Sequence, residues 1–207
     1  MEPRKADVLI HNGTVLTMNK NGDILQRGGI AVLKDTIAEV FEEAELANWQ
    51  ADTVIDARQG IILPGLVNTH THASMTCFRG LADDLPLMVW LNDHIFPAEA
   101  KLDEEKVYIG AMLACAEMIQ SGTTCFCDMY LFENAVARAA AETGLRAVVG
   151  EVLYDFPSPN YGPLENGFRY TETLIERCAL NGRLPEPLRT AHLIAGGIAQ
   201  GESRHRA

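Results

Sequence analysis

Residues 61–72 read IILPGLVNTHTH, and this stretch decides the fold. An apolar, β-branched run leads directly into a His-x-His pair, His70 and His72. In a strand, residues two apart lie on one face, so both imidazoles would point the same way from its C-terminal end. Two nitrogen ligands on one face can begin a metal site. The alternative interpretation is a pair of histidines that only form hydrogen bonds at a polar strand end. The surrounding structure distinguishes this from a metal site.

The chain changes character near Gly60. Before it, short apolar segments alternate with turn dipeptides such as Asn12-Gly13, which predicts a small β domain, or part of one, over residues 1–60. After it, strands alternate with helices. Asp103 is expected to cap a helix that ends at Gly122, and an alanine-rich helix is expected over 133–143. This alternation predicts a parallel sheet of the α/β class.

Composition narrows the classes of partner and the compartment. The formal charge is −11, and no dense block of lysine and arginine is present, so we expect neither nucleic acid nor an anionic membrane as a partner. The N-terminus has no apolar signal core and no run is long enough to span a bilayer, which predicts a cytoplasmic protein. Five cysteines form no Cys-x-x-Cys pair. We interpret Cys125 and Cys127 as small buried hydrophobes, with a thiolate metal site as the alternative.

An apolar insertion, Met75 to Lys101, follows the histidine pair. If the histidines lie at the mouth of a barrel, this segment lies over that mouth and can wall off a pocket for an apolar or aromatic ligand. A helix that packs on the barrel rim is the other interpretation, and the two are compatible. Glu99 is the carboxylate placed to reach inward, although a solvated side chain is the default for a single glutamate.

Several motifs agree in order with a known family. The segments are residues 64–72 (PGLVNTHTH), 87–91 (LMVWL), 95–99 (IFPAE), 117–124 (EMIQSGTT) and 128–130 (DMY). Together they resemble the amidohydrolase superfamily, and more narrowly its 5-methylthioadenosine/S-adenosylhomocysteine deaminase group, close to the chlorohydrolase and guanine deaminase branches. The likeness runs from about residue 6 to residue 173 and is more specific than the His-x-His pair alone.

This resemblance implies the N-terminal portion of a metal-dependent hydrolase, a (β/α)8 TIM barrel preceded by part of a small β-sandwich domain. The expected limits are 1–60 for the β domain, 61–194 for the first strands and helices of the barrel, and 195–207 for an atypical tail. His70 and His72 would bind a divalent metal, zinc or else iron. Glu99 would hold the ribose hydroxyls of the substrate, which reverses the default given above.

The implied reaction is hydrolysis of a C–N bond that is not a peptide bond. Water activated by the metal would deaminate the adenine ring of S-adenosylhomocysteine or 5′-methylthioadenosine and release ammonia. A further histidine ligand, an acid/base glutamate and an aspartate come from the second half of such barrels, so no catalytic acid or base is assigned here. The expectation is a truncated, inactive chain, with a homo-oligomer left open for the full-length form.

Two points stay open from the sequence alone. His192 falls near the fourth strand, but the residues after it do not match the family pattern, so we interpret it as a chance histidine rather than a substrate-site residue. The alternative functions are an amidohydrolase for a guanine or chlorotriazine type of substrate, and a non-catalytic metal-binding or assembly fragment.

Overall fold

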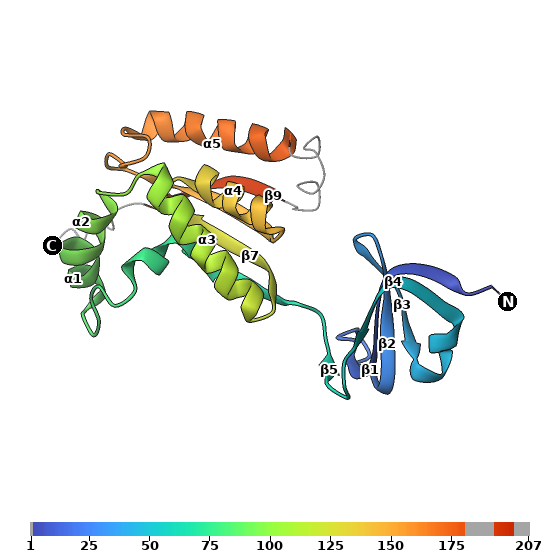
Figure 1. The fold of residues 1–207 in the computed structure, drawn as a ribbon. Helices are drawn as coiled ribbons and strands as arrows, with labels where there is room; N and C mark the ends of the chain where they lie inside the picture. The colour runs from blue at the N-terminus through green and yellow to red at the C-terminus, as the bar shows by residue number, and fades with distance from the viewer. Residues whose placement is uncertain (1, 181–192, 201–207) are drawn as a thin grey trace. The chain divides into compact units, whose positions relative to one another are not determined.

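The structure, a computed structural model, describes residues 2–180 and 193–200. It divides into two compact units, Met1–Gly65 and Leu66–Ala207, and each is described by itself (Figure 1). Among the described residues, no helix combines the length and the apolar character needed to cross a membrane. His192 and residues 201–207 lie outside the described residues.

The first unit is a five-stranded sheet. Its strands are β1 (Arg4–Leu16), β2 (Ile24–Leu33), β3 (Thr36–Glu42), β4 (Trp49–Asp56) and β5 (Ile61–Ile62), with the short 3-10 helix η1 (Glu43–Asn48) before β4. The order is β3-β2-β1-β4, and β5 pairs with β1. A small core of Ala6, Leu9, Ala31 and Phe41 holds one face together.

The expected turn at Asn12-Gly13 is wrong. Strand β1 runs through this dipeptide, and its register with β2 shifts there. Asn12 takes a positive φ of 57°, and its backbone N–H donates to Glu43 at 2.8 Å. An extra residue in a bulge uses the same left-handed conformation that a turn would use, so the dipeptide alone does not separate the two.

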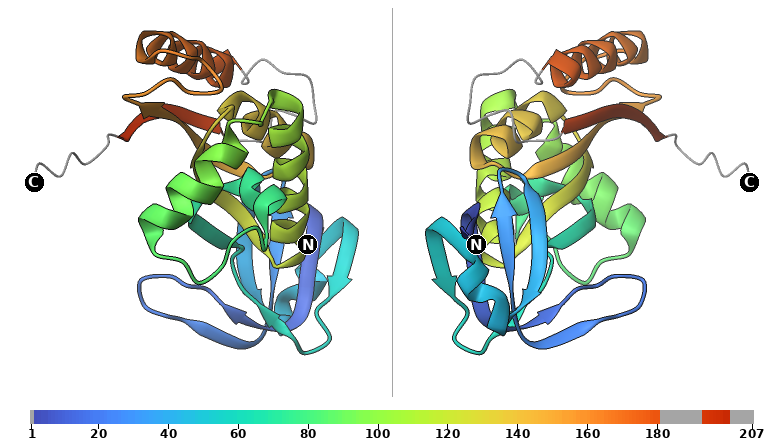
Figure 2. Two further views of the ribbon diagram at one scale, coloured as in Figure 1. Left: turned by 90° about the vertical axis from the view of Figure 1, so that its left-hand side faces the viewer. Right: turned by 90° about the vertical axis from the view of Figure 1, so that its right-hand side faces the viewer.

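The second unit is a parallel sheet covered by helices. Its strands are β6 (Leu66–Thr71), β7 (Thr123–Tyr130), β8 (Arg146–Tyr154) and β9 (Leu193–Gln200), in that order across the sheet. The connecting helices are α3 (Glu104–Gln120), α4 (Glu133–Thr143) and α5 (Leu164–Leu180). They lie next to one another along the sheet, and Figure 2 shows α5 running beside β8 and β9. This is the strand–helix alternation of the predicted barrel.

Helices α3 and α4 form where the sequence predicts them. Asp103 accepts a hydrogen bond from the Lys106 N–H at 2.9 Å and so caps α3, while Gly144, at φ 77°, ends α4. Ala135, Val136, Ala139 and Ala140 of α4 are fully buried in the main core. Small side chains let α4 pack closely between its neighbours.

Short irregular helices connect β6 to α3. They are η2 (Ala73–Phe78), α1 (Leu87–Val89), the π-helical η3 (Trp90–Ile95) and α2 (Phe96–Glu99). Gly110 of α3 allows η2 to approach, because a Cβ at this position would lie 2.6 Å from the Ser74 carbonyl oxygen. The apolar insertion expected over 75–101 therefore folds as a series of short turns over the end of the sheet.

The division of the chain falls five residues after the predicted one. Ile61 and Ile62 form β5 and pair with β1 in the first unit, and the first strand of the parallel sheet begins at Leu66. At the other end, residues 193–200 continue the sheet as β9, although part of this segment was expected to be an atypical tail. The limits of the domains in the intact protein stay a prediction.

Candidate active site

The two histidines lie together at the C-terminal end of β6. His70 is in the strand, and His72 follows it at the start of η2. Their rings are 5.0 Å apart between centroids and nearly perpendicular. The carboxyl end of a parallel strand is where barrel enzymes place their reactive groups, so the position predicted from the sequence is the position observed.

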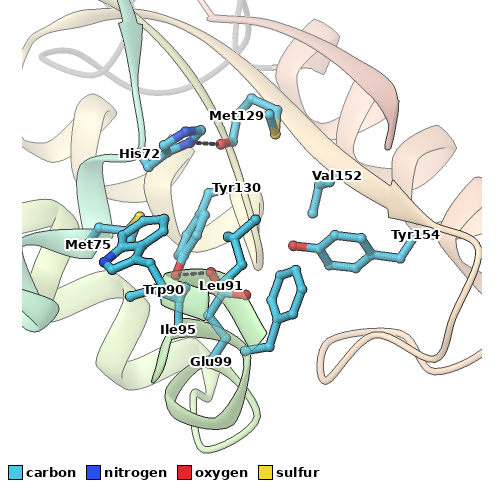
Figure 3. A pocket seen from close by; sticks show the side chains of 11 residues that line it. His72, Met75, Trp90, Leu91, Ile95, Glu99, Met129, Tyr130, Val152 and Tyr154 are labelled. Carbon is cyan, nitrogen blue, oxygen red and sulfur yellow. Dashed lines mark hydrogen bonds between the residues drawn. The ribbon is translucent and has the colours of Figure 1, made fainter. Parts of the chain in front are cut away.

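His72 is held in one tautomer by its neighbours. Its Nδ1 lies within hydrogen-bond distance of the Met129 carbonyl oxygen on β7 (Figure 3). A carbonyl oxygen only accepts, so Nδ1 carries the hydrogen and the lone pair of the neutral ring lies on Nε2. Metal-binding histidines are oriented in this way by a partner on the other ring nitrogen. The arrangement of His72 therefore fits a metal ligand.

The turn after His72 is also fixed. The Asp128 carboxylate accepts a hydrogen bond from the Ala73 N–H at 2.9 Å, and the His72 carbonyl accepts one from the Met75 N–H at 2.9 Å. Asp128 is 1% exposed, so this bond forms away from water. These contacts keep the backbone that carries His72 in place.

His70 and His72 are two donors, and no cluster of three or more metal-binding side chains occurs in the described parts of the chain. Catalytic zinc sites use three protein ligands or more. The geometry and donor type of the pair thus fit part of a divalent-metal site, with further donors required. Cys125 and Cys127 do not add to it as a thiolate cluster in the described structure.

The prediction that both of these cysteines are buried is wrong, because each is half-buried. Strand β7 directs Phe126 and Asp128 toward the covered side of the sheet, where both are buried. Cys125 and Cys127 alternate with them and lie on the other face, which the described residues leave partly uncovered.

Glu99 lies in the pocket that His72 lines. Its side chain is 5% exposed, which contradicts the default expectation of a solvated glutamate. The Tyr130 hydroxyl donates to Glu99 Oε1 at 2.7 Å (Figure 3). Burial raises the pKa of Glu99, and the hydrogen bond from Tyr130 opposes this rise. A carboxylate with one oxygen already bound can accept a further hydrogen bond from a ligand.

Apolar and aromatic side chains form the rest of this pocket: Met75, Trp90, Leu91, Ile95, Phe96, Met129, Tyr130, Val152 and Tyr154. The cavity measures about 90 Å³, well below the roughly 300 Å³ at which pockets for drug-sized ligands begin. The described residues therefore line one wall of a site for a ligand of nucleoside size. Trp90 and Ile95 come from the insertion, as expected of a segment that walls off a pocket.

The sequence interpretation missed three buried carboxylates and two tyrosines. Asp128, Glu133 and Glu151 are at most 1% exposed, and burial raises the pKa of Asp128 to about 7 and that of Glu151 to about 7. Tyr130 and Tyr154 end strands β7 and β8 in the pocket. Their position at the carboxyl ends of predicted barrel strands was the available signal.

Curated proteins with similar sequences include deaminases. The 5-methylthioadenosine/S-adenosylhomocysteine deaminase of Syntrophobacter fumaroxidans is 61% identical over 178 residues, which cover 86% of this chain and 41% of that protein. The 5′-deoxyadenosine deaminase of Methanosarcina barkeri is 51% identical over 167 residues, which cover 80% of this chain and 38% of that protein. The chain thus spans about two fifths of the length of these relatives.

Among solved structures, an adenosine deaminase from Xanthomonas campestris with bound zinc superimposes with a TM-score of 0.85. It is 34% identical, and the match covers 95% of this chain and 43% of that one. The model of the amidohydrolase family matches residues 61–197, which include the histidine pair, Glu99, strands β6 to β8 and the first part of β9. The chain belongs to the amidohydrolase family.

Proposed function

We propose that this chain contributes the first half of the active site of a metal-dependent deaminase that acts on adenine nucleosides. The substrates are of the S-adenosylhomocysteine and 5′-methylthioadenosine type, and the reaction releases ammonia. The observation that carries the proposal is the buried Glu99, held by Tyr130 in the pocket that His72 also lines. The named activities of the Syntrophobacter and Xanthomonas relatives support it.

In this proposal His70 and His72 are ligands of a divalent metal, which we take to be zinc. A bound ion supplies activated water for hydrolysis. The Met129 carbonyl engages Nδ1 of His72, so Nε2 would be the nitrogen that binds the ion, and Asp128 fixes the turn that follows. Apolar side chains around the pocket exclude bulk water, which strengthens each polar contact to a substrate.

Glu99 binds the ribose hydroxyls. An ionised carboxylate accepts hydrogen bonds from hydroxyl groups, and such charge-assisted bonds contribute about 1.5–3 kcal/mol. A free base or a chlorotriazine has no ribose, so a buried carboxylate at this position would be left without its partner. Glu99 therefore favours a nucleoside over the guanine or chlorotriazine type of substrate.

The compartment and assembly remain predictions of the same proposal. All five cysteines are free, as expected in a reducing cytoplasm. We keep a homo-oligomer as the expectation for the full-length form.

The test uses a chimera in which the stretch of this chain that aligns with the Syntrophobacter relative replaces the corresponding stretch of that protein. With zinc bound, ammonia release is measured from 5′-methylthioadenosine, S-adenosylhomocysteine, adenine and guanine. We expect turnover of the two nucleosides. Glu99→Gln should lower kcat/KM for them by about 10- to 100-fold, from the loss of a charged acceptor.

Metal content should be unchanged in the Glu99→Gln chimera. Glu105→Gln, an exposed glutamate on α3, is the matched control and should behave as the parent does. Preference for a free base, or full nucleoside turnover after Glu99→Gln, would refute the proposed role of this pocket.

A further inference from the structure

Tyr154 is a buried residue whose hydroxyl has no hydrogen-bond partner among the described residues. The residue is 5% exposed and ends strand β8. Within the described part of the chain its hydroxyl makes no hydrogen bond, whereas its backbone N–H donates to the Tyr161 hydroxyl at 2.8 Å. The hydroxyl oxygen itself is not sealed from solvent, so a ligand in the pocket can reach it.

The hydroxyl points into the pocket. Figure 3 shows the Tyr154 ring entering from β8, with its oxygen directed toward the side chains that line the cavity. Glu99 and Tyr130 lie in the same pocket, on α2 and β7. The Tyr130 hydroxyl is already used in its hydrogen bond to Glu99. Of the two tyrosine hydroxyls, the one on Tyr154 is therefore left to bind a ligand.

The Tyr154 ring is held rigidly by other aromatic side chains. It stacks on Phe156, with ring centroids 4.4 Å apart and an interplanar angle of 18°. It meets Phe96 edge-to-face at 6.3 Å, and Phe96 belongs to the same short helix as Glu99. This packing fixes the hydroxyl relative to the helix that carries the carboxylate, so the two polar groups are preorganised.

The Tyr154 hydroxyl and the Glu99 carboxylate differ in their hydrogen-bonding capacity. Burial and the nearby Glu99 charge raise the pKa of Tyr154, so the hydroxyl stays neutral and can donate. Glu99, when ionised, only accepts. A ligand hydroxyl both donates and accepts, so a donor and an acceptor that line one pocket suit the vicinal hydroxyls of a ribose.

We propose that Tyr154 is a specificity-determining residue that donates a hydrogen bond to the ribose diol of the nucleoside that Glu99 binds. This inference rests on the proposed function, because it assigns a second partner to the same sugar. It predicts that the hydroxyl contributes to ligand binding and contributes nothing to the stability of the free chain.

The experiment measures both quantities for Tyr154→Phe. Binding is followed by the change in tryptophan fluorescence from Trp90, which lines the pocket, in a Trp49→Phe background that removes the other tryptophan of this chain. The chain and the chimera are both titrated with adenosine, 2′-deoxyadenosine and 3′-deoxyadenosine after removal of metal with a chelator, so that no turnover occurs. Thermal unfolding is recorded on the same samples.

We expect Tyr154→Phe to weaken adenosine binding by about three- to ten-fold, the usual effect of one hydrogen bond. For at least one of the two deoxynucleosides, Tyr154→Phe should not weaken binding, because the ribose hydroxyl that Tyr154 would contact is already missing from that ligand. The melting temperature should stay the same or rise. Tyr170→Phe is the control, since the Tyr170 hydroxyl accepts from the Asn134 N–H at 3.1 Å outside this pocket. It should lower the melting temperature and leave binding unchanged.

Adenosine binding that is unchanged by Tyr154→Phe would overturn the role of Tyr154 and leave the proposed function standing. An equal loss for all three nucleosides would also overturn it, because the contact would not be with the diol. If neither the chain nor the chimera binds adenosine, the inference falls together with the proposed function.

Discussion

At the scale of single residues, His72 is oriented by its neighbours in the way that the proposed role as a metal ligand requires. The Met129 carbonyl fixes the tautomer, and the Asp128 bond to Ala73 fixes the backbone. His70 is exposed and lies beside His72. If the pair binds a metal as proposed, His72 is the preorganised ligand and His70 the freer one, and both should be required for tight binding of an ion.

We expect His70→Ala or His72→Ala in the chimera to abolish stoichiometric zinc. Loss of an outer-shell partner already costs roughly 10–100-fold in metal affinity, and loss of a ligand should cost more. Zinc per chain is measured by atomic spectroscopy after dialysis. His94→Ala is the matched control, because His94 lies on η3 and does not line the pocket. One zinc retained per chain after either substitution at the pair would show that the ion binds elsewhere.

The residues that the sequence located well are those whose position follows from local pattern, while the roles of the histidine pair and of Glu99 stay predictions. The His-x-His pair lies at the end of a strand, Asp103 caps a helix, and Glu99 is the last residue of the motif at 95–99. Tyr130, Tyr154 and the buried carboxylates were missed for a physical reason. Their importance comes from burial and from partners on other elements, such as Tyr130 with Glu99, which are 31 residues apart.

At the scale of elements, helix α4 begins in an unusual way. Phe132, which precedes it, has a positive φ of 57° and offers no side-chain cap. Glu151 of β8 caps the helix instead. Its carboxylate accepts hydrogen bonds from the backbone N–H groups of Glu133, at 2.9 Å, and Phe132, at 3.3 Å. The first turn of α4 is thus tied to the neighbouring strand by a carboxylate. No sequence pattern within α4 reveals this cap.

Glu133 gives this element a testable dependence on pH. It is completely buried, neither carboxyl oxygen has a hydrogen-bond donor within the described structure, and burial beside Asp128 and Glu151 raises its pKa well above the usual range. In the unfolded chain a glutamate titrates near pH 4.3. Above that pH the folded chain holds the extra proton, so stability falls as pH rises toward the raised pKa.

We therefore expect Glu133→Gln to have little effect at pH 4 and to stabilise the chain progressively at higher pH. The gain in the free energy of unfolding is at most about 1.4 kcal/mol per pH unit, the value of a one-unit shift in pKa. Urea unfolding of the chimera between pH 4 and pH 8 measures it. Glu105→Gln, on the surface of α3, should give a difference that does not grow with pH. A pH-independent effect of Glu133→Gln would mean that Glu133 is ionised in the folded chain.

At the scale of the whole molecule, residues 2–180 and 193–200 form one sheet of four parallel strands and one sheet of five strands. In the described structure β6 and β9 are the edges of the parallel sheet, and Leu66 and Val67 of β6 are 53% and 61% exposed. Barrels remove such edges by closing. The expectation that residues 1–207 alone are inactive and fold poorly stays a prediction, and this exposed apolar surface is its physical basis.

The sequence predicted the order of strands and helices in this unit, because hydrophobic periodicity and caps are local. It placed the division between units five residues early. The run at 61–63 is apolar and rich in β-branched residues, which suits a strand of either sheet. Which sheet it joins depends on the strand it pairs with, and in the structure that strand is β1. Pairing is a property of the folded chain, so periodicity alone could not locate the division.

The central claim is that one pocket holds a metal at the histidine pair and a ribose at Glu99. A crystal structure of the chimera with zinc and S-adenosylhomocysteine, recorded at the zinc absorption edge, tests it most directly. We predict an anomalous peak about 2.0–2.1 Å from one nitrogen of His70 and of His72, and a ribose hydroxyl about 2.5–2.7 Å from Glu99. Zinc bound away from the histidine pair, or a nucleoside whose ribose does not reach Glu99, would contradict the account.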